Sequence, residues 1–295
     1  MAVETITVGQ VDILAISDCT MEIDVCNFFP NKSFTDMDPY RHYLDEDCNV
    51  KGGINVGAFL ISTKRRRILV DAGLGPGPWE SLGRNVRGNL PGELSRRNID
   101  PSNIDAVIVT HMHFDHIGWL VTESDGVLRR TFPKAQLLIP KADWDLLLSS
   151  EKVKSPPAPN HFSTNALTLF AGSSTLGKNI ERMGNFELVS GEHNVTDEIT
   201  IVPTPGHTPG HQSVLITSAG QRAFVMGDVA HLPMQLHVPD WVAQADVQPE
   251  LAKKTRAETL DWLESEGLLV ASGHFPAPGF GRVIRGEARR YWKPL

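Results

Sequence analysis

The residues most able to do chemistry in this chain are metal ligands, and four of them fall within six consecutive positions. The segment from Thr110 to His116 reads Thr-His-Met-His-Phe-Asp-His. Three more candidate ligands each adjoin a glycine near the end of an apolar stretch: His207, Asp228 and His274. Imidazole and carboxylate groups together bind zinc, iron, manganese or cobalt. One such histidine would be an ordinary turn or cap residue, but this concentration predicts a metal-dependent hydrolase.

The spacing of these side chains predicts two metal ions. Residues two apart in an extended stretch face the same way, so His111 and His113 can reach one ion. Asp115 and His116 follow where the chain turns into a helix, and they can hold a second ion about 3.5–4 Å from the first. Each ion needs further ligands from other loops, and three residues can supply them: His207, His274 and, as a bridging carboxylate, Asp228.

Apolar stretches that read as strands run directly into these ligands. Ala106–Thr110 leads into His111, and Leu268–Ala271 leads towards His274. Other strands are expected at 6–16, 55–61, 67–70, 136–139, 186–189, 199–202, 213–216 and 223–226. Helices are expected near 92–97, at 141–149 and at 250–266, the last between Pro249 and Gly267. Two batches of strands, each followed by helices, predict two packed sheets with helices outside and a site along one common edge.

The composition describes an ordinary globular protein of 295 residues, 41% hydrophobic and 21% charged. The net charge of -7 argues against nonspecific binding to nucleic acid. No apolar run approaches the roughly 20 residues that cross a bilayer, and the N-terminus lacks a signal-peptide pattern. We therefore expect a cytoplasmic protein with no nucleic-acid or membrane partner.

Three cysteines, Cys19, Cys26 and Cys48, all lie in the first 50 residues. Their odd number and the lack of a Cys-x-x-Cys pair predict reduced thiols, without a disulfide framework or a zinc knuckle. The ligand cluster spans most of the chain, so we expect one domain over residues 1–295. The proline-rich stretch Ser155–Asn160 predicts an excursion or lid near 150–175.

The order His-x-His-x-Asp-His, followed by separated His, Asp and His, resembles the metallo-β-lactamase superfamily over nearly the whole chain. Val70–Gly73 and Pro205–His211 resemble its Asp-x-Gly and second ligand motifs. Within the superfamily, 207–213 and 274–281 are most similar to the N-acyl homoserine lactonases and methyl parathion hydrolase. The resemblance implies a four-layer αββα sandwich of two mixed sheets with helices outside.

The resemblance also implies a ligand for each position of a binuclear centre. It assigns to one metal His111, His113 and His207, and to the other Asp115, His116 and His274. Asp228 and a hydroxide would bridge the two ions, for which zinc is the first expectation and iron, manganese or cobalt the alternatives. The hydroxide would attack an ester or lactone bond. An organophosphate triesterase is the alternative, ahead of a thioesterase or a β-lactamase.

Three positions depart from the family pattern. Asp228 stands where the commonest zinc β-lactamases have a cysteine, which argues against antibiotic hydrolysis. His231 stands where the lactonases have a tyrosine near the substrate carbonyl, and in this respect the chain is closer to the parathion hydrolase pattern. Trp119 follows Gly118 where many members have a second glycine, and it either packs in the core or forms a pocket wall.

Several residues are expected to support the reaction. Asp115 can take up a proton from the attacking water, and His231 either donates a hydrogen bond to the substrate or is a structural loop residue. Asp71 either accepts the free ring N–H of a ligating histidine or caps a turn. A pocket for a small, neutral and partly apolar substrate is expected from aromatic residues in loops, which could instead be buried under loops or in a homodimer face: Phe28, Phe29, Phe275 and Phe280. Trp119 is the further candidate for a pocket wall.

Overall fold

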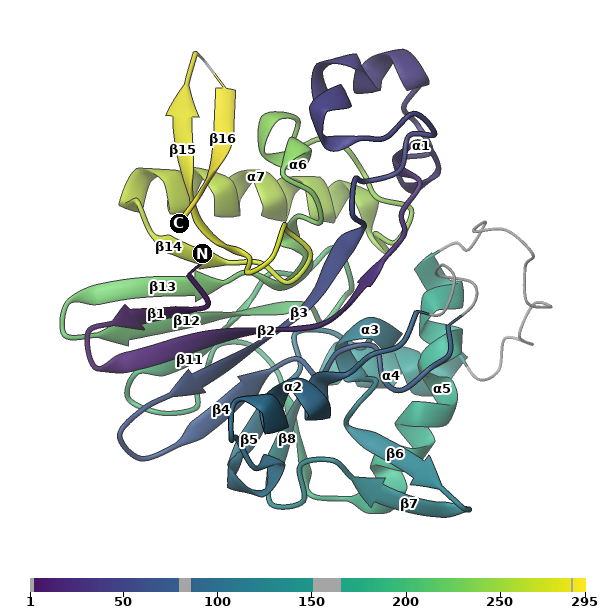
Figure 1. Ribbon diagram of the computed structural model, residues 1–295, viewed down its shortest axis with the longest axis vertical. Coiled ribbons are helices and arrows are strands. Elements are labelled where there is room, and N and C mark those ends of the chain that lie inside the picture. The colour runs from purple at the N-terminus through teal and green to yellow at the C-terminus, as the bar shows by residue number, and fades with distance from the viewer. Residues whose placement is uncertain (1–2, 80–85, 151–165, 288) are drawn as a thin grey trace.

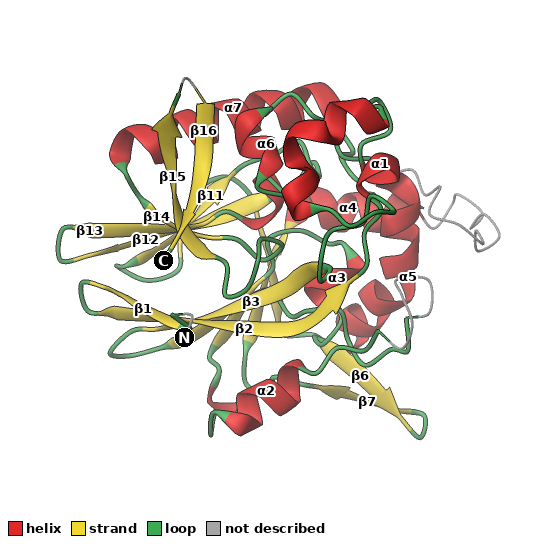
Figure 2. Cartoon of the chain, turned by 45° about the horizontal axis from the view of Figure 1, so that its top comes forward, coloured by secondary structure: helices red, strands yellow, loops and turns green. Residues whose placement is uncertain are grey.

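Two seven-stranded sheets lie face to face, with helices on their outer sides (Figures 1 and 2), in the computed structural model of the chain. The structure describes residues 3–79, 86–150, 166–287 and 289–295. This arrangement is the predicted four-layer αββα sandwich. Among the helices in these ranges, none combines the length and the apolar character that crossing a bilayer requires.

The first sheet is built from the N-terminal half of the chain. Its strands, in spatial order, are β1 (Thr5–Val8), β2 (Val11–Met21), β3 (Ile54–Ser62), β4 (Arg67–Val70), β5 (Ala106–Ile108), β8 (Gln136–Pro140) and β9 (Phe186–Val189). The pairs from β1 to β4 are antiparallel, whereas those from β4 to β9 are parallel, so the sheet is mixed. A separate hairpin joins β6 (Val121–Ser124) to β7 (Val127–Arg130).

The second sheet follows the order of the chain. Its strands are β10 (His193–Asn194), β11 (Ile199–Pro203), β12 (Gln212–Ser218), β13 (Gln221–Val225), β14 (Leu269–Ala271), β15 (Phe280–Gly286) and β16 (Arg289–Pro294). Only β13 and β14 run parallel, because the long helix α7 connects them, and this sheet is therefore mixed as well.

The helices lie in the two outer layers and within the loops around the ligand residues. The α-helices are α1 (Val25–Phe28), α2 (Leu90–Arg96), α3 (Phe114–Ile117), α4 (Lys141–Ser150), α5 (Ala166–Met183), α6 (Met234–His237) and α7 (Pro249–Glu266). The 3₁₀ helices are η1 (Phe34–Tyr43), η3 (Pro101–Asn103) and η4 (Gly227–Val229). Helix α7 matches its prediction because Pro249 opens it and Gly267, with a φ of 59°, ends it in the left-handed conformation.

Three apolar layers hold the sandwich together. Between the sheets, buried side chains of both pack on one another, among them Ile13 and Ile61 against Val214 and Ile216. Outside the first sheet, its residues join a cluster with α2, α4 and α5, and outside the second sheet α7 packs on β13 and β14. Burial on both faces explains why β3 reads as an almost continuous apolar run.

One expectation differs from the structure near the N-terminus. The single strand expected at 6–16 is wrong, because Gly9, with a φ of 60°, turns the chain between β1 and β2. The lid expected near 150–175 is not a difference of this kind: it falls largely on residues 151–165, which lie outside the described residues, and it stays a prediction. From Ala166 onward the chain forms α5, a helix of the outer layer.

Candidate metal centre

The seven predicted ligands meet at one edge of the sandwich, where strands of both sheets end. His111 and His113 lie in the loop after β5, and Asp115 and His116 lie in the short helix α3 that follows it. The others follow strands of the second sheet: His207 lies between β11 and β12, Asp228 in η4 after β13, and His274 after β14. All seven side chains are buried, which is costly for polar groups unless they have partners.

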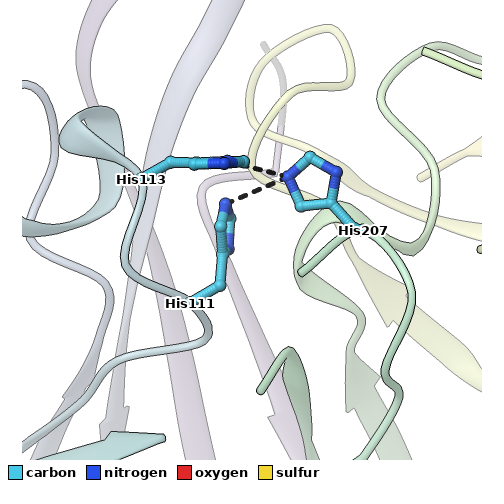
Figure 3. A group of neighbouring side chains, drawn as sticks. All are labelled: His111, His113 and His207. Carbon is cyan, nitrogen blue, oxygen red and sulfur yellow. Dashed lines mark hydrogen bonds between the residues drawn. The ribbon is translucent and has the colours of Figure 1, made fainter. Parts of the chain in front are cut away.

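His111, His113 and His207, here called the first triad, point their ring nitrogens at one another (Figure 3). His207 Nε2 lies 3.2 Å from His111 Nε2 and 3.0 Å from His113 Nδ1. Three imidazole nitrogens that converge on one point form three corners of a tetrahedral metal site. The structure thus brings together the first predicted ligand set.

Asp115, His116 and His274, here called the second triad, lie beside the first. Asp115 Oδ2 is 3.7 Å from His116 Nε2 and 3.5 Å from His274 Nε2. The ligand atoms of this triad also lie within 4.8 Å of one another. His116 Nε2 has no hydrogen-bond partner within the described ranges, although it is fully enclosed. A buried nitrogen in that state fits a metal ligand.

Asp228 lies between the two triads. Its Oδ2 is 3.2–3.7 Å from the Nε2 atoms of five histidines: His111, His116, His207, His231 and His274. Its Oδ1 accepts no hydrogen bond from the part of the chain that the structure describes. Burial would raise the pKa of Asp228, but the charges of His274 and His116 hold it well below its usual range. An ionised carboxylate in this position fits a bridge between two cations.

Asp71 orients a histidine in each triad. His116 Nδ1 lies 2.9 Å from Asp71 Oδ2 and donates to it, because a carboxylate only accepts. Thr110 Oγ1 donates to the same carboxylate over 2.9 Å and therefore accepts from His111 Nδ1, 3.0 Å away. With the proton on Nδ1, each ring turns Nε2 towards the cluster. The predicted supporting contact of Asp71 with a ligand histidine is present.

Asp246, a residue that sequence reasoning missed, orients His207 of the first triad. His207 Nδ1 lies 2.9 Å from Asp246 Oδ1, and the fully buried Arg256 donates to Asp246 Oδ2 over 3.2 Å. Burial would raise the pKa of Asp246, but the bond with His207 and the charge of Arg256 lower it to about 2. The carboxylate is thus ionised and holds His207 as Asp71 holds His116.

Asp143, at the start of α4, was also missed, and it joins the two ligand loops. Its carboxylate accepts from the backbone N–H of Met112 over 3.1 Å, from Thr208 Oγ1 over 2.8 Å and from the N–H of Gly210 over 2.6 Å. The bonds span 31 to 67 positions of the chain. No local pattern marks a single aspartate on a helix for such a role, so neither residue has a signal in this one sequence.

Two further acceptors complete the support of the site. His274 Nδ1 lies 2.8 Å from the carbonyl oxygen of Asn55 in β3, so a loop of the second sheet is anchored on the first. His211 Nε2 accepts the backbone N–H of Asp228 over 2.9 Å, and its Nδ1 lies 3.0 Å from Thr204 O. His211 therefore supports the backbone of Asp228 and is not itself directed into the cluster.

The titration of the two triads differs. Burial lowers the pKa of His111 and His113 well below the ordinary value, and neighbouring imidazoles add to this effect. Burial acts in the same direction on His116 and His274, but the carboxylates of Asp228 and Asp115 together outweigh it, helped at His116 by Asp71, and raise both pKa values, that of His274 to about 9. In the protein without metal, the first pair is therefore neutral and the second pair holds protons near neutral pH.

A cavity opens directly onto the metal centre. Its described lining includes five residues of the cluster and six apolar side chains: Met21, Ile23, Phe28, Ile54, Phe114 and Ala245. Its polar lining outside the cluster consists of Glu22, Asp24, Asn27 and Gln244, with His231 at the floor. No lysine or arginine belongs to the described lining.

Of the predicted pocket residues, one lines this cavity and the others do not. Phe28 belongs to the lining. Phe29 is fully buried against Trp241, Phe275 is fully buried against Trp292, and neither lines the cavity. Trp119 packs on the core of the first sheet and donates its Nε1–H to Asp18 over 2.9 Å. None of these three lines the pocket: neighbouring layers cover Phe29 and Phe275, and Trp119 packs in the core, which was one of its two expected alternatives.

His231 lines the cavity next to Asp228. Its Nε2 is 3.4 Å from Asp228 Oδ2, and its Nδ1 has no hydrogen-bond partner among the described residues. The ring of Phe28 meets it edge-on with 5.1 Å between centroids. Gln235 Oε1 accepts the backbone N–H of His231 over 2.8 Å and so fixes the loop. The imidazole is thereby held at the cavity, and its Nδ1 remains able to form a hydrogen bond.

These residues fit two divalent cations: the first triad with Asp228 for one, and the second triad with Asp228 for the other. The fold and the site together define a metal-dependent hydrolase of the two-sheet sandwich type. Residues 52–274 match the family model of the metallo-beta-lactamase superfamily, and the chain belongs to that superfamily.

The chain is similar to three known proteins, two by sequence and one by structure. YobT of Bacillus subtilis (strain 168) is 26% identical over 243 residues, 80% of this chain and 87% of that protein. The N-acyl homoserine lactonase AiiA of Bacillus thuringiensis subsp. kurstaki is 22% identical over 233 residues, 74% of this chain and 80% of that protein. The structure of AidC, a dizinc quorum-quenching lactonase, aligns with a TM-score of 0.83 over 100% of this chain and 97% of that one. At 20% identity this last likeness shows the shared fold.

Proposed function

We propose that this hydrolase uses two divalent metal ions, most simply zinc, to cleave the ester or lactone bond of a small uncharged substrate. The observation that carries the proposal is the cavity above the two triads. Its walls are apolar, and its charged lining outside the metal cluster consists of the carboxylates Glu22 and Asp24. An anionic substrate would meet these carboxylates without a counter-charge, whereas a neutral acyl chain would pack against Phe28 and Ile54.

The bound ions would supply Lewis acidity and a water of lowered pKa at the cavity floor. The chain supplies the groups around that reaction. Asp115 lines the cavity and has a carboxylate oxygen 3.5 Å from His274 Nε2, so it can take a proton from the attacking water and return it to the leaving oxygen. His231 can donate a hydrogen bond to the substrate carbonyl from a nitrogen that has no other partner.

The named relatives support an acyl substrate. AiiA is an N-acyl homoserine lactonase, and AidC was solved with the product N-hexnoyl-L-homoserine. An N-acyl homoserine lactone combines a neutral ring ester, an amide and an apolar tail. The cavity offers the amides of Asn27 and Gln244 to such an amide and an apolar wall to such a tail. We therefore place lactones first among the substrates to test.

A substrate panel on protein of known metal content tests the proposal. It consists of an N-acyl homoserine lactone series, an aryl ester and methyl parathion. We expect kcat/KM to be highest for a lactone or ester and to rise as the acyl chain grows to fill the apolar wall. A higher kcat/KM for methyl parathion than for every ester and lactone would select the organophosphate triesterase instead.

His231→Phe tests the role of the imidazole in the cavity floor. Loss of one transition-state donor costs about 10²-fold in kcat, and we expect the variant to keep two ions per chain. His237→Phe is the matched control, because His237 packs on Tyr40 and Tyr291 and does not belong to the cavity lining. A loss of metal from His231→Phe would show that the residue is a ligand and would contradict the donor role.

A further inference from the structure

Two of the three cysteines lie side by side in the segment that joins β2 to β3. Cys26 is the second residue of α1, and Cys48 lies in the loop after η1, 22 positions later. Their Sγ atoms are 2.6 Å apart. A disulfide bond is about 2.05 Å long, so the two sulfurs are within roughly half an ångström of bonding distance. The pairing was not expected from the odd cysteine count.

The backbone on both sides already holds the two cysteines in register. Asp24 and Asn49 form an antiparallel bridge, and the N–H of Val25 donates to the carbonyl oxygen of Cys48 over 3.0 Å. Cys48 itself has a φ of 68°, a conformation that a residue with a side chain adopts only when its surroundings hold it there. Bond formation between the sulfurs therefore requires little movement of the chain.

A metal ion is the other use of two adjacent thiols, since Asp24 completes a group of three possible ligands. The carboxylate of Asp24 is already engaged. Its Oδ1 accepts the N–H groups of Cys26 and Asn27 as the cap of α1, and its Oδ2 accepts from Asn27 Nδ2 over 2.6 Å. Two sulfurs remain, which is fewer than the four ligands of a structural zinc site. The geometry therefore favours a bond between the sulfurs.

The position of the pair gives such a bond a consequence for the cavity. The segment 22–28 forms one wall of it, through Glu22, Ile23, Asp24, Asn27 and Phe28. Figure 1 shows α1 and the η1 segment as one excursion above the ends of β2 and β3. Cys26 is two residues from Phe28, whose ring touches that of His231. A covalent bond at Cys26 would hold this wall against the Cys48 loop.

We propose that Cys26 and Cys48 form a reversible disulfide, which fastens the cavity wall of residues 22–28 to the Cys48 loop under oxidising conditions. A small-molecule disulfide such as oxidised glutathione serves as the oxidant. The Cys26 thiolate attacks one glutathione sulfur, so that a mixed disulfide forms and one glutathione thiol leaves. Cys48 then attacks the Cys26 sulfur and displaces the second glutathione. Two electrons pass to the glutathione disulfide, and the two cysteine protons end on the released thiols.

The thiol chemistry predicts a slow switch. Burial and the contact with Cys48 raise the pKa of Cys26 to about 12, so that little thiolate is present at neutral pH. A thiol of high pKa is also a poor leaving group, so the disulfide would resist reduction once formed. Oxidation is accordingly expected over hours rather than seconds, and faster as the pH rises.

The experiment compares the full-length, metal-loaded protein after incubation with reduced or oxidised glutathione. In oxidised wild type we expect the titratable thiols to fall from three to one, and a peptide digest to link Cys26 to Cys48. Hydrogen exchange of residues 22–28 should slow. Cys19→Ser is the matched control and should behave in the same way, with its remaining thiol lost, whereas Cys26→Ser and Cys48→Ser should form no such link.

Three results would overturn the proposal: three thiols that remain titratable, a stable glutathione adduct on Cys26, or a metal ion released when the thiols are blocked. A Cys26–Cys48 link without any change in hydrogen exchange at 22–28 would show that the disulfide does not fasten the cavity wall. The wild-type comparison decides the matter even if a serine variant folds poorly. None of these readouts uses catalysis, so the result is independent of the proposed hydrolase activity.

Discussion

The two triads of the candidate metal centre lie on either side of Asp228, yet they differ in charge. The first triad consists of three imidazoles, and burial lowers the pKa of two of them, His111 and His113. The second contains the carboxylate Asp115 and two imidazoles whose pKa values are raised by Asp228. His111 and His113 thus present neutral nitrogens to an incoming cation, whereas His116 and His274 must give up protons when a cation binds.

Their supports differ as well. The first triad draws on Asp246 for His207 and on Thr110 for His111, whereas the second draws on Asp71 for His116 and on a backbone carbonyl for His274. Because Thr110 also bonds to Asp71, that one carboxylate reaches both triads. We infer that the two metal sites are unequal: each can be weakened separately through its own anchor, and both together through Asp71 or Asp228.

Removal of the shared residue should have the largest effect and abolish the distinction between the sites. Asp228→Ala leaves five histidine nitrogens around an empty space, without the negative charge that offsets two cations. We expect less than one ion per chain by elemental analysis and a fall of at least about 10³-fold in kcat/KM. Asp197→Ala, at an exposed position, is the control. Two retained ions with normal turnover would contradict a bridging role for Asp228.

Substitution of the carboxylates that orient the ligand histidines should change the metal affinities of the two sites differently. Loss of a carboxylate that orients a ligating histidine costs roughly 10–100-fold in metal affinity. Asp246→Ala should weaken one ion of the two by that factor, because it frees His207 alone. Asp71→Ala should weaken both. Titration against a chelator measures the two affinities, and equal losses at both sites in Asp246→Ala would contradict the separation.

Asp246→Ala has a second consequence that a control must remove. It leaves the buried Arg256 guanidinium without its counter-charge, which costs about 3 kcal/mol of stability. The double variant Asp246→Ala/Arg256→Met should regain stability in urea unfolding but not metal affinity. Recovery of both would show that the metal loss came from unfolding, and would withdraw the anchoring role of Asp246.

The ligands could be predicted from the sequence and their supports could not. The segment from His111 to His116 concentrates its ligands locally, and strand ends mark the others, so spacing sufficed to find the set. Asp246 and Asp143 act across 39 and up to 67 positions, and nothing local distinguishes them from surface aspartates. Long-range contacts of this kind depend on how the two sheets pack.

The layers were equally predictable, whereas the surroundings of the pocket were not. Apolar periodicity identified most strands and α7, but it merged β1 with β2 because Gly9 is a weak signal within an alternating run. Aromatic residues near the ligands were expected to face the substrate. Phe29 and Phe275 are instead covered by tryptophans from distant segments, which the pattern of one strand or loop cannot reveal.

A change of pH should alter the metal affinities of the two triads differently, by a smaller factor than the substitutions above. Burial would lower the pKa of His274, but Asp228 raises it to about 9, so its proton must leave when a metal binds to Nε2. Affinity at the second triad should therefore fall by up to about tenfold for each unit of pH below 9, per displaced proton. The first triad, with His111 and His113 already neutral, should show a shallower dependence at neutral pH.

Calorimetric titration in buffers of different ionisation enthalpy measures the protons released by each ion. We expect the second triad to lose its ion first as the pH falls from 8 to 6. Asp246→Ala provides the comparison, because it weakens the first triad without touching His274. The same number of protons released at both sites would contradict the electrostatic difference between them.

The smallest effects are expected next to the ligand loops. Trp119 follows the loop of the first sheet and Phe275 follows His274, yet both side chains turn into core layers. Trp119→Phe removes the indole bond to Asp18 and should cost about 1 kcal/mol, and Phe275→Leu about 1–2 kcal/mol. Neither should change kcat/KM more than about twofold or lower the metal content. A tenfold change in KM for one of them, with stability intact, would show that the cavity extends to that side of the centre.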